Sequence, residues 1–302
     1  MYEQIRKNKQ KTFLVLFTFV VLVTIVGVAF NFLLGYGTVG IIVAVAIAIS
    51  MSFFSYYYSD TVALKAAKAI PADPAEYKRL HNLVEGLCIA AGLPKPKIYI
   101  VNDASPNAFA TGRNPKHCAI AVTTGLLDVM NRVELEGVLA HELSHIKNYD
   151  ILVSTIALTA VGAVVVLSQV GSRMAFFGGA RSNRSSNDND SGGAGSILMI
   201  VPLLLLVLAP FAARLLQFAI SRNRECLADA SAVGLTRYPP GLISALEKLK
   251  ADSSVVTSGS SITASMWIEQ PMDNEEKKPS WFQKAFATHP PLEERIARLK
   301  EM

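Results

Sequence analysis

The stretch TFLVLFTFVVLVTIVGVAFNFLLGYGTVGIIVAVAIAISMSFFSYYYS, residues 12–59, contains no Asp, Glu, Lys or Arg. Its two halves, at about 13–34 and 39–58, each match the roughly 20 apolar residues needed to cross a hydrocarbon core. The first half is too long for the apolar region of a signal peptide, and three tyrosines at 56–58 stand where an interfacial aromatic belt is expected. A buried hairpin in a soluble protein would need this whole stretch enclosed on every side. We therefore predict a membrane hairpin.

Two further uncharged tracts, 151–172 and 191–213, lie in the second half of the chain. They are weaker candidates for spans, because the first contains Ser, Thr and Gln and the second is interrupted by Pro210. Either both cross the bilayer, which we favour, or they form a hairpin that rests partly on protein. Residues 171–195 are rich in Gly, Ser and Asn, which predicts a flexible loop between the two segments.

The three uncharged tracts account for the low charge content of the whole chain. Charged side chains make up 18% of the 302 residues, whereas ordinary soluble proteins carry roughly 25%. The remainder has the usual charge content and is long enough for one domain with its own core. This division excludes a wholly soluble enzyme, a disordered chain and a disulfide scaffold, but not catalysis. The predicted units are an N-terminal hairpin (1–59), a domain formed by 60–150 and 214–302, and a second hairpin (151–213).

Basic side chains flank the first hairpin on both sides. They are Arg6, Lys7, Lys9 and Lys11 before it and Lys65 and Lys68 after it. Lys and Arg beside short connections mark the cytoplasmic side of a membrane, so both ends of the hairpin and the domain are predicted to be cytoplasmic. The three cysteines show no metal-binding or disulfide spacing, which fits a reducing compartment. The sequence contains no basic stripe with interleaved aromatic residues, so it gives no sign of a nucleic-acid partner.

Residues 133–150, VELEGVLAHELSHIKNYD, have apolar residues at three- and four-residue steps, as in a helix with one buried face. Within them, His141, Glu142 and His145 form an HExxH pattern. Histidines at i and i+4 project side by side and can share one tetrahedral metal ion. Glu142 projects to one side of the pair, where it can act as general base towards a zinc-activated water. The pattern also arises by chance, but such polar residues are unfavourable on a partly buried helix without a ligand.

A catalytic zinc site needs a third protein ligand. The candidates are an acidic residue on another helix and the remaining histidines, His81, His117 and His289. Glu225 and Asp229 lie one helical turn apart and can face the same side. One carboxylate would then bind the metal, while the other is hydrogen-bonded to a ligand histidine. The alternative is a solvated helix in which Arg222 and Arg224 form exposed ion pairs.

Three motifs, HELSHIKNYD (141–150), SRNRECLADASA (221–232) and THPPLEERIARL (288–299), together resemble the HtpX-type membrane zinc endopeptidases. These are gluzincins related to the CAAX prenyl proteases, and the resemblance extends over nearly the whole chain. It implies one Zn²⁺ per chain, with His141, His145 and Glu225 as ligands and Glu142 as the base. Asp229 would be the acidic residue behind a ligand histidine.

The resemblance also implies contacts with the substrate. KIYIVN (97–102) and HCAIAVT (117–123) predict strands, and in similar proteases the intervening NAFATG segment lies along the cleft. Asn107 can then bind a backbone group of the substrate; alternatively it is a turn asparagine near Pro106.

His289 precedes two prolines and a short amphipathic helix. By resemblance it reaches the active site and stabilises the developing oxyanion, a role for which Arg295 and Arg298 are weaker candidates. The alternative is a purely structural residue at the start of that helix. We expect His81 and His117 to be structural.

The predicted fold is mainly α: a multi-pass membrane protein with four transmembrane helices and a cytoplasmic α+β zincin-like protease domain. The leading function is a zinc endopeptidase that cleaves membrane-associated or misfolded proteins at the bacterial inner membrane, with quality control, stress response and self-cleavage implied by resemblance. The alternatives are a narrow-specificity processing protease for lipid-tagged or signalling peptides and a non-catalytic scaffold. No nucleotide cofactor is expected. The short distance between the ligand motifs and the later uncharged tracts places the metal within about 10–20 Å of the membrane.

Overall fold

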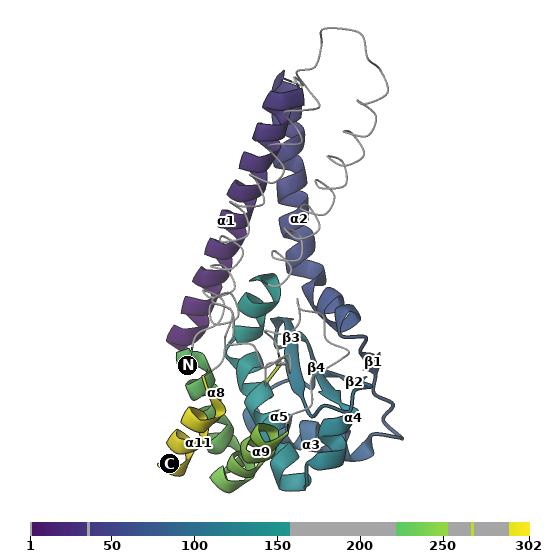
Figure 1. Cartoon of the computed structure of the whole chain (residues 1–302), viewed down its shortest axis with the longest axis vertical. Coiled ribbons are helices and arrows are strands. Elements are labelled where there is room, and N and C mark those ends of the chain that lie inside the picture. Colours follow the sequence, from purple (N-terminus) through teal and green to yellow (C-terminus); the bar gives the residue numbers. More distant parts are fainter. Residues whose placement is uncertain (1, 35–36, 158–221, 253–266, 269–289) are drawn as a thin grey trace, which may run out of the picture.

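Two long helices, α1 (Tyr2–Leu34) and α2 (Gly37–Ala66), lie side by side and project from the rest of the chain (Figure 1). The computed structural model describes residues 2–34, 37–157, 222–252, 267–268 and 290–302. Within these ranges, two helical segments are long and apolar enough to cross a membrane, Ile5–Ile25 and Gly37–Ala66. Large apolar side chains on both helices are open to the surroundings, with Phe13 72% and Val39 69% exposed. An apolar outer surface of this kind suits contact with lipid.

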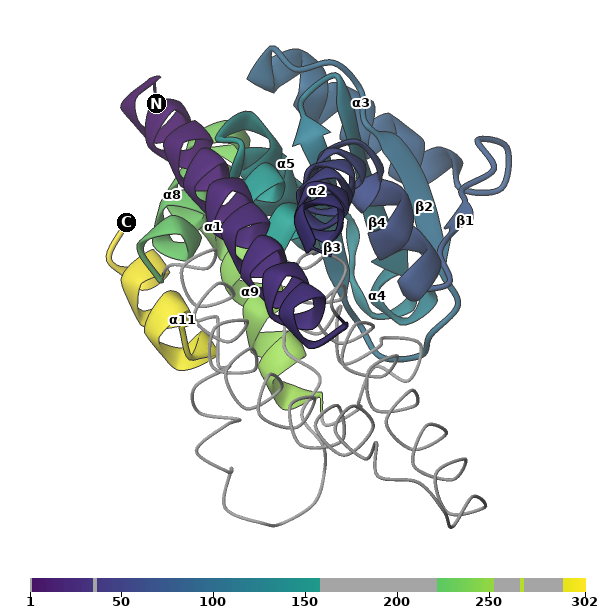
Figure 2. The same ribbon diagram turned by 90° about the horizontal axis from the view of Figure 1, so that it is seen from above.

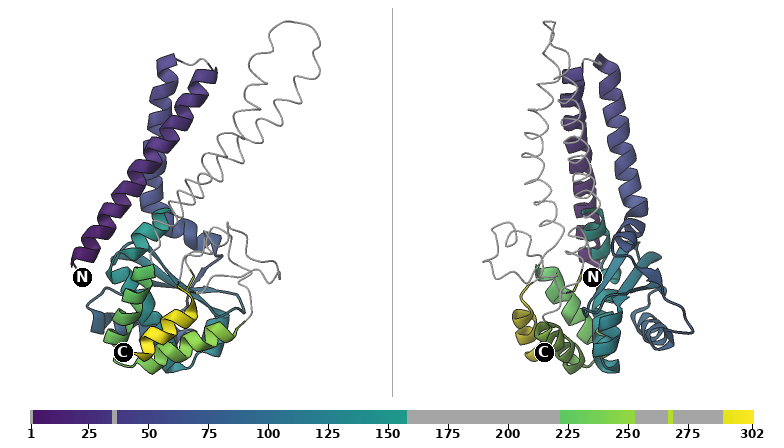
Figure 3. Two further views of the ribbon diagram at one scale, coloured as in Figure 1. Left: turned by 60° about the vertical axis from the view of Figure 1, so that its left-hand side comes forward. Right: turned by 45° about the vertical axis from the view of Figure 1, so that its right-hand side comes forward.

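The second helix of the hairpin continues into the domain. α2 ends at Ala66 and not at about 58, where the predicted span ends. The reason is that its last turns bury Ala63 and Leu64, and Leu64 packs with Phe109 and Ala121 of the sheet. The membrane hairpin is therefore joined to the domain by a continuous helix (Figure 3).

A four-stranded sheet forms one side of the domain. Its strands are β1 (Ile70–Pro71), β2 (Lys97–Val101), β3 (Ala108–Asn114) and β4 (His117–Thr123), in the order β1-β2-β4-β3. β2 and β4 are parallel, and the other two pairs are antiparallel. The strands predicted at 97–102 and 117–123 are thus confirmed, and β3 between them in sequence lies at the end of the sheet.

Six helices complete the described domain. They are α3 (Lys78–Ala91), α4 (Thr124–Val129), α5 (Arg132–Lys147), α8 (Arg222–Thr236), α9 (Pro239–Ala251) and α11 (Leu292–Lys300). Seen from above, α5 lies between the sheet and the pair α8 and α9 (Figure 2). A Cβ on Gly137 of α5 would lie only 2.9 Å from the backbone nitrogen of Leu242 in α9. Glycine therefore permits the close approach of these two helices.

The helix predicted over 133–150 is confirmed as α5 up to Lys147, and its predicted end is wrong because Tyr149, with positive φ, turns the chain. Asn131 caps its first turn by accepting hydrogen bonds from the backbone N–H groups of Val133 and Glu134, and Glu134 accepts one from the Asn131 N–H. This capping box satisfies donors that a helix start leaves free. The expected apolar face is fully buried. It consists of Leu135, Val138, Leu139, Leu143 and Ile146.

Most of the predicted second hairpin (151–213), including the loop 171–195, lies outside the described residues, as does His289. The described part, 150–157, is a helical segment that follows α5 after a short turn. Its Leu152 and Ile156 pack against Val15 of α1. The chain that leaves the HExxH helix therefore runs directly onto the first membrane helix.

Candidate metal centre

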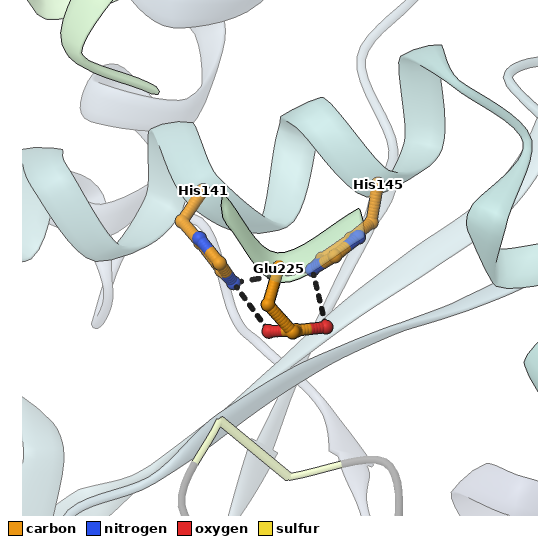
Figure 4. A group of neighbouring side chains, drawn as sticks. All are labelled: His141, His145 and Glu225. Atoms are coloured by element: carbon orange, nitrogen blue, oxygen red, sulfur yellow. Dashed lines mark hydrogen bonds and ion pairs between the residues drawn. The ribbon is translucent and has the colours of Figure 1, made fainter. Parts of the chain in front are cut away.

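The HExxH residues meet a carboxylate from another helix in the middle of the domain. His141 Nε2 and His145 Nε2 on α5 are 3.1 Å apart, with their rings nearly perpendicular at 88°. Glu225 reaches them from α8, with Oε2 3.5 Å from His141 Nε2 and Oε1 3.6 Å from His145 Nε2 (Figure 4). One ligand atom from each residue lies within 4.8 Å of the others. The structure thus brings together two histidines and a glutamate that lie about 80 residues apart in sequence.

The spacing of these atoms fits a tetrahedral metal ion. Zinc binds histidine nitrogen and carboxylate oxygen at about 2.0–2.2 Å, which places neighbouring ligand atoms of a tetrahedron about 3.3 Å apart. The two Nε2 atoms, 3.1 Å apart, are close to that value, and each has one oxygen of Glu225 at 3.5 or 3.6 Å, Oε2 for His141 and Oε1 for His145. Three protein ligands leave one position of the tetrahedron for water or substrate, as in catalytic rather than structural zinc sites.

The buried charge around the centre also favours a divalent cation. Four acidic and two basic side chains there are each at most 5% exposed. They are Glu142, Asp150, Glu225 and Asp229, against Arg224 and Arg295. Buried charges are costly unless they are paired or coordinate a metal. A dication would balance the excess of negative charge in this group.

Each histidine has a second carboxylate behind its ring. Asp229 Oδ1 lies 2.8 Å from His141 Nδ1, and Asp150 Oδ2 lies 3.1 Å from His145 Nδ1. A partner on Nδ1 orients the ring and keeps the Nε2 lone pair available for the metal. The sequence indicated Asp229 but not Asp150. Tyr149, with φ +61°, turns the chain back, so helical spacing from His145 does not reveal Asp150.

A buried arginine holds the carboxylate behind His141. Arg295 of α11 donates from Nε and Nη2 to the two oxygens of Asp229, at 2.8 and 2.6 Å. Burial opposes ionisation of Asp229, but Arg295 and then His141 hold its pKa well below the usual value. The sequence contained one sign of this role, because Arg295 falls on the apolar side of an amphipathic helix, next to Ile296.

The same charges act on His141. Burial and the Arg295 cation lower its pKa, but Asp229 and Glu225 outweigh them and raise it to about 9. In the protein without metal, a proton on His141 therefore supplies part of the positive charge that the carboxylates require. Metal binding must displace that proton, since only neutral imidazole is a ligand.

The other histidine candidates lie elsewhere. His81 Nε2 is 3.2 Å from the carbonyl oxygen of Ala72, and His117 is exposed and contacts Asn114. Neither belongs to the metal-binding group found among the described residues.

Arg298 lies away from the centre, unlike Arg295, and the alternative of a solvated helix with an exposed Arg224 is wrong. Arg298 is exposed and donates to Cys226 and Glu294, away from the ligands. Arg224, expected to be solvated if α8 had no site, is buried 3.6 Å from Asp150.

Asn107 lies immediately before β3 and is 2% exposed. Its backbone N–H donates to Thr123 Oγ1 at 2.8 Å, and its side-chain oxygen accepts from the Ala108 N–H. One residue further, the Ala108 carbonyl accepts a hydrogen bond from the Ile268 N–H at 3.1 Å. This end of β3 therefore already accepts a backbone donor from a distant part of the chain.

Comparison with known proteins decides the family. The model of peptidase family M48 matches residues 74–302. The chain belongs to peptidase family M48. Over 301 residues it is 44% identical to a protein named "Protease HtpX homolog" from Dictyoglomus turgidum, covering all of this chain and 94% of the relative. It is also 43% identical to proteins of the same name from Limosilactobacillus reuteri and Listeria monocytogenes, with complete coverage of both chains.

A solved structure has a similar fold. The crystal structure of S. mikatae Ste24p matches with a TM-score of 0.50 and 18% identity, over 99% of this chain and 67% of that one. The resemblance seen in the sequence motifs is confirmed: this chain is an M48 metalloprotease of the HtpX type, a peptide-bond hydrolase and a membrane protein.

Proposed function

We propose that this M48 protease is a zinc-dependent endopeptidase with one Zn²⁺ bound by His141, His145 and Glu225. The observation that carries the proposal is that one ligand atom from each of these residues lies within 4.8 Å of the others, with the two Nε2 atoms 3.1 Å apart. When bound, zinc supplies the Lewis acid that acidifies a water molecule and polarises the peptide carbonyl.

The side chains of the centre take complementary parts in hydrolysis. Glu142, buried beside His141 on α5, accepts a proton from the attacking water and delivers it to the leaving amine. Asp229 and Asp150 accept hydrogen bonds from the two Nδ1–H groups, so that both Nε2 atoms face the ligand carboxylate. His289 stays a prediction as the donor to the oxyanion.

The end strand of the sheet is proposed to bind the substrate backbone. An extended peptide can add to a sheet edge through main-chain hydrogen bonds, which give affinity without strong side-chain selectivity. The hydrogen bond from Ile268 to Ala108 supports this use of β3. Asn107, next to Ala108 and buried, is proposed to contact a substrate backbone group at the same end of the strand.

The substrates are proposed to be membrane-associated or misfolded proteins, cleaved at the cytoplasmic face of the bacterial inner membrane. The contacts of Leu152 and Ile156 with Val15 support a position close to the bilayer, because they join the end of the HExxH helix to the first membrane helix. The basic residues at both ends of the hairpin support the cytoplasmic side.

The test is zinc analysis combined with removal of the base. We expect the full chain, purified in detergent, to contain about one zinc per molecule. Glu142→Gln should keep the metal and lose at least about 100-fold in kcat on an unstructured protein substrate, since general-base catalysis typically contributes 10²–10⁴-fold.

Glu136→Gln is the matched control, because it makes the same change on the same helix outside the HExxH pattern. Cleavage at the normal rate by Glu142→Gln would contradict the assigned base. Wild-type protein that hydrolyses peptides equally well after complete removal of zinc would contradict the proposed function.

A further inference from the structure

The first turns of the membrane helix α1 contact the turn that follows the HExxH helix. Asn8 is fully buried, and its Nδ2 donates to the Asn148 carbonyl at 2.8 Å and to Asp150 Oδ1 at 2.7 Å. The next residue, Lys9, places its Nζ 4.8 Å from the centre of the Tyr149 ring. Three consecutive residues of this turn are therefore contacted from α1.

These contacts continue to a metal ligand. Asp150 uses Oδ1 for Asn8 and Oδ2 for His145 Nδ1, at 2.7 and 3.1 Å. We propose that Asn8 is a positioning residue for the metal centre: it orients His145 through Asp150, so that metal affinity depends on how the membrane hairpin is seated on the domain. This inference rests on the proposed function, because it takes His145 to be a zinc ligand.

The amide of Asn8 suits this role for a geometric reason. A carboxylate can rotate about its side-chain bonds, and a directional donor on one oxygen fixes which oxygen faces His145. The amide offers two N–H donors. One fixes Oδ1 of Asp150 and the other the Asn148 carbonyl at the end of α5, so both ends of the turn are held from the same side chain.

The turn itself needs such support. Tyr149 has φ +61°, a conformation that is uncommon for a residue with a Cβ and persists where the surroundings hold it. Arg224 also approaches Asp150 Oδ1, but at 3.6 Å, which is longer than a hydrogen bond. Among the contacts described for this oxygen, Asn8 therefore provides the directional one.

The seating of α1 does not depend on Asn8 alone. Val15 packs with Leu152 and Ile156, and Thr12 Oγ1 donates to the Asn8 carbonyl within the helix. Removal of the Asn8 side chain is thus expected to leave α1 in place while releasing Asp150. This separation makes the positioning role testable apart from folding.

The experiment measures metal binding on the full chain in lipid nanodiscs, in a Glu142→Gln background that prevents self-cleavage. Zinc affinity is measured by competition with a chromophoric chelator, and ligand geometry by the absorption bands of Co²⁺ in place of zinc. Loss of a group that directly supports a ligand costs about 10–100-fold in metal affinity. Asn8 is one step further away, so we expect Asn8→Ala to weaken zinc binding about three- to tenfold and to shift the Co²⁺ bands.

Two further variants distinguish positioning from packing. Thr12→Val removes a buried hydrogen bond from the same helix without touching Asp150, and it should keep zinc affinity within about twofold. Asn8→Asp preserves the shape of the side chain but sets a second carboxylate against Asp150. It should bind zinc more weakly than Asn8→Ala, whereas a packing role alone predicts the opposite order.

The double variant gives the decisive outcome. If Asn8 acts through Asp150, Asn8→Ala has no further effect on zinc affinity when Asp150→Ala is already present. Additive losses, or wild-type zinc affinity in Asn8→Ala, overturn the inference while leaving the proposed function intact. Failure of the Glu142→Gln parent itself to bind zinc overturns both.

Discussion

The two histidines of the proposed metal centre, His141 and His145, stand one turn apart on α5, yet different regions of the molecule support them. Behind His141 lie Asp229 and Arg295, which come from α8 and α11 of the protease domain. Behind His145 lie Asp150 and Asn8, the latter from the membrane hairpin. The His141 side chain is 1% exposed and that of His145 14%. One histidine is thus held inside the domain, and the other where the domain meets the N-terminal hairpin.

The two supports also differ in strength. Arg295 donates two short charge-assisted hydrogen bonds to Asp229, 2.6 and 2.8 Å long. Such bonds are stronger and more directional than neutral ones. Asp150 receives one hydrogen bond from a neutral amide, and its nearest arginine lies at 3.6 Å. Asp229 is therefore held by more and stronger hydrogen bonds than Asp150, and under the proposal above only the His145 half responds to the position of α1.

Removing each of the two supporting carboxylates in turn is the strongest test of the difference between the two supports. Either Asp229→Ala or Asp150→Ala is expected to weaken zinc binding by about 10–100-fold. Asp229→Ala should in addition lower the free energy of unfolding by about 3–5 kcal/mol, because it leaves Arg295 buried without its hydrogen-bonded partner, with only Glu225 4.0 Å away. Chelator competition measures the first effect, and urea denaturation of the metal-free protein the second.

Asp150→Ala should cost distinctly less stability, since its closest hydrogen bond is to an amide. Equal losses of unfolding free energy in the two variants would show that the two halves are equally rigid.

A smaller effect is expected from Arg295→Lys. The change keeps the positive charge but loses the two-pronged contact with Asp229, for which a lysine is no substitute. One hydrogen bond to a charged group is worth about 1.5–3 kcal/mol, and we expect a loss of stability of that size with a several-fold weaker zinc affinity. Thermal unfolding and chelator competition measure both.

The exposed Arg298 on the same helix provides the control, as Arg298→Lys should change neither quantity. A fully stable Arg295→Lys protein would mean that charge alone, without geometry, supports His141.

Much of the architecture was predictable, because it depends on local patterns. The uncharged stretch over 12–59 predicts the hairpin, and the periodicity of 133–150 predicts α5. The spacing of His141 and His145 alone predicts that they lie on one face of a helix. The spacing of Glu225 and Asp229 predicts the same for these two carboxylates. These features depend on helical geometry that repeats every few residues.

The supports behind the ligands could not be predicted in the same way. Asp150 follows a residue with positive φ, so no regular period relates it to His145. Asn8 lies 142 residues from Asp150 in the sequence, between the basic residues Lys7 and Lys9. Contacts of this kind arise when separate elements pack, and a single sequence carries no pattern for them.

The smallest predicted effect lies at the far end of α5 and provides the reference for the others. Glu134 closes the capping box and accepts hydrogen bonds from Ser244 Oγ and Lys248 Nζ, at 2.6 and 2.7 Å. Burial raises the pKa of Glu134, but Lys248, Ser244 and the Asn131 N–H together lower it below the usual value. A pKa lowered by folding means that the ionised carboxylate stabilises the native state.

Gln can still close the capping box, so Glu134→Gln removes the ion pair with Lys248 and should lower the free energy of unfolding at pH 7 by up to about 1 kcal/mol. The stabilisation by Glu134 is present above the unfolded pKa of about 4.3 and disappears as the pH falls through the lower folded value. The difference between wild type and variant should thus shrink as the pH falls below about 4, in urea titrations of the metal-free protein. Because Glu134 touches neither histidine nor its carboxylate, zinc affinity at pH 7 should stay unchanged. A marked loss of zinc affinity in Glu134→Gln would mean that the metal centre responds to the stability of α5 as a whole. Changes in zinc affinity would then not distinguish the two histidine supports.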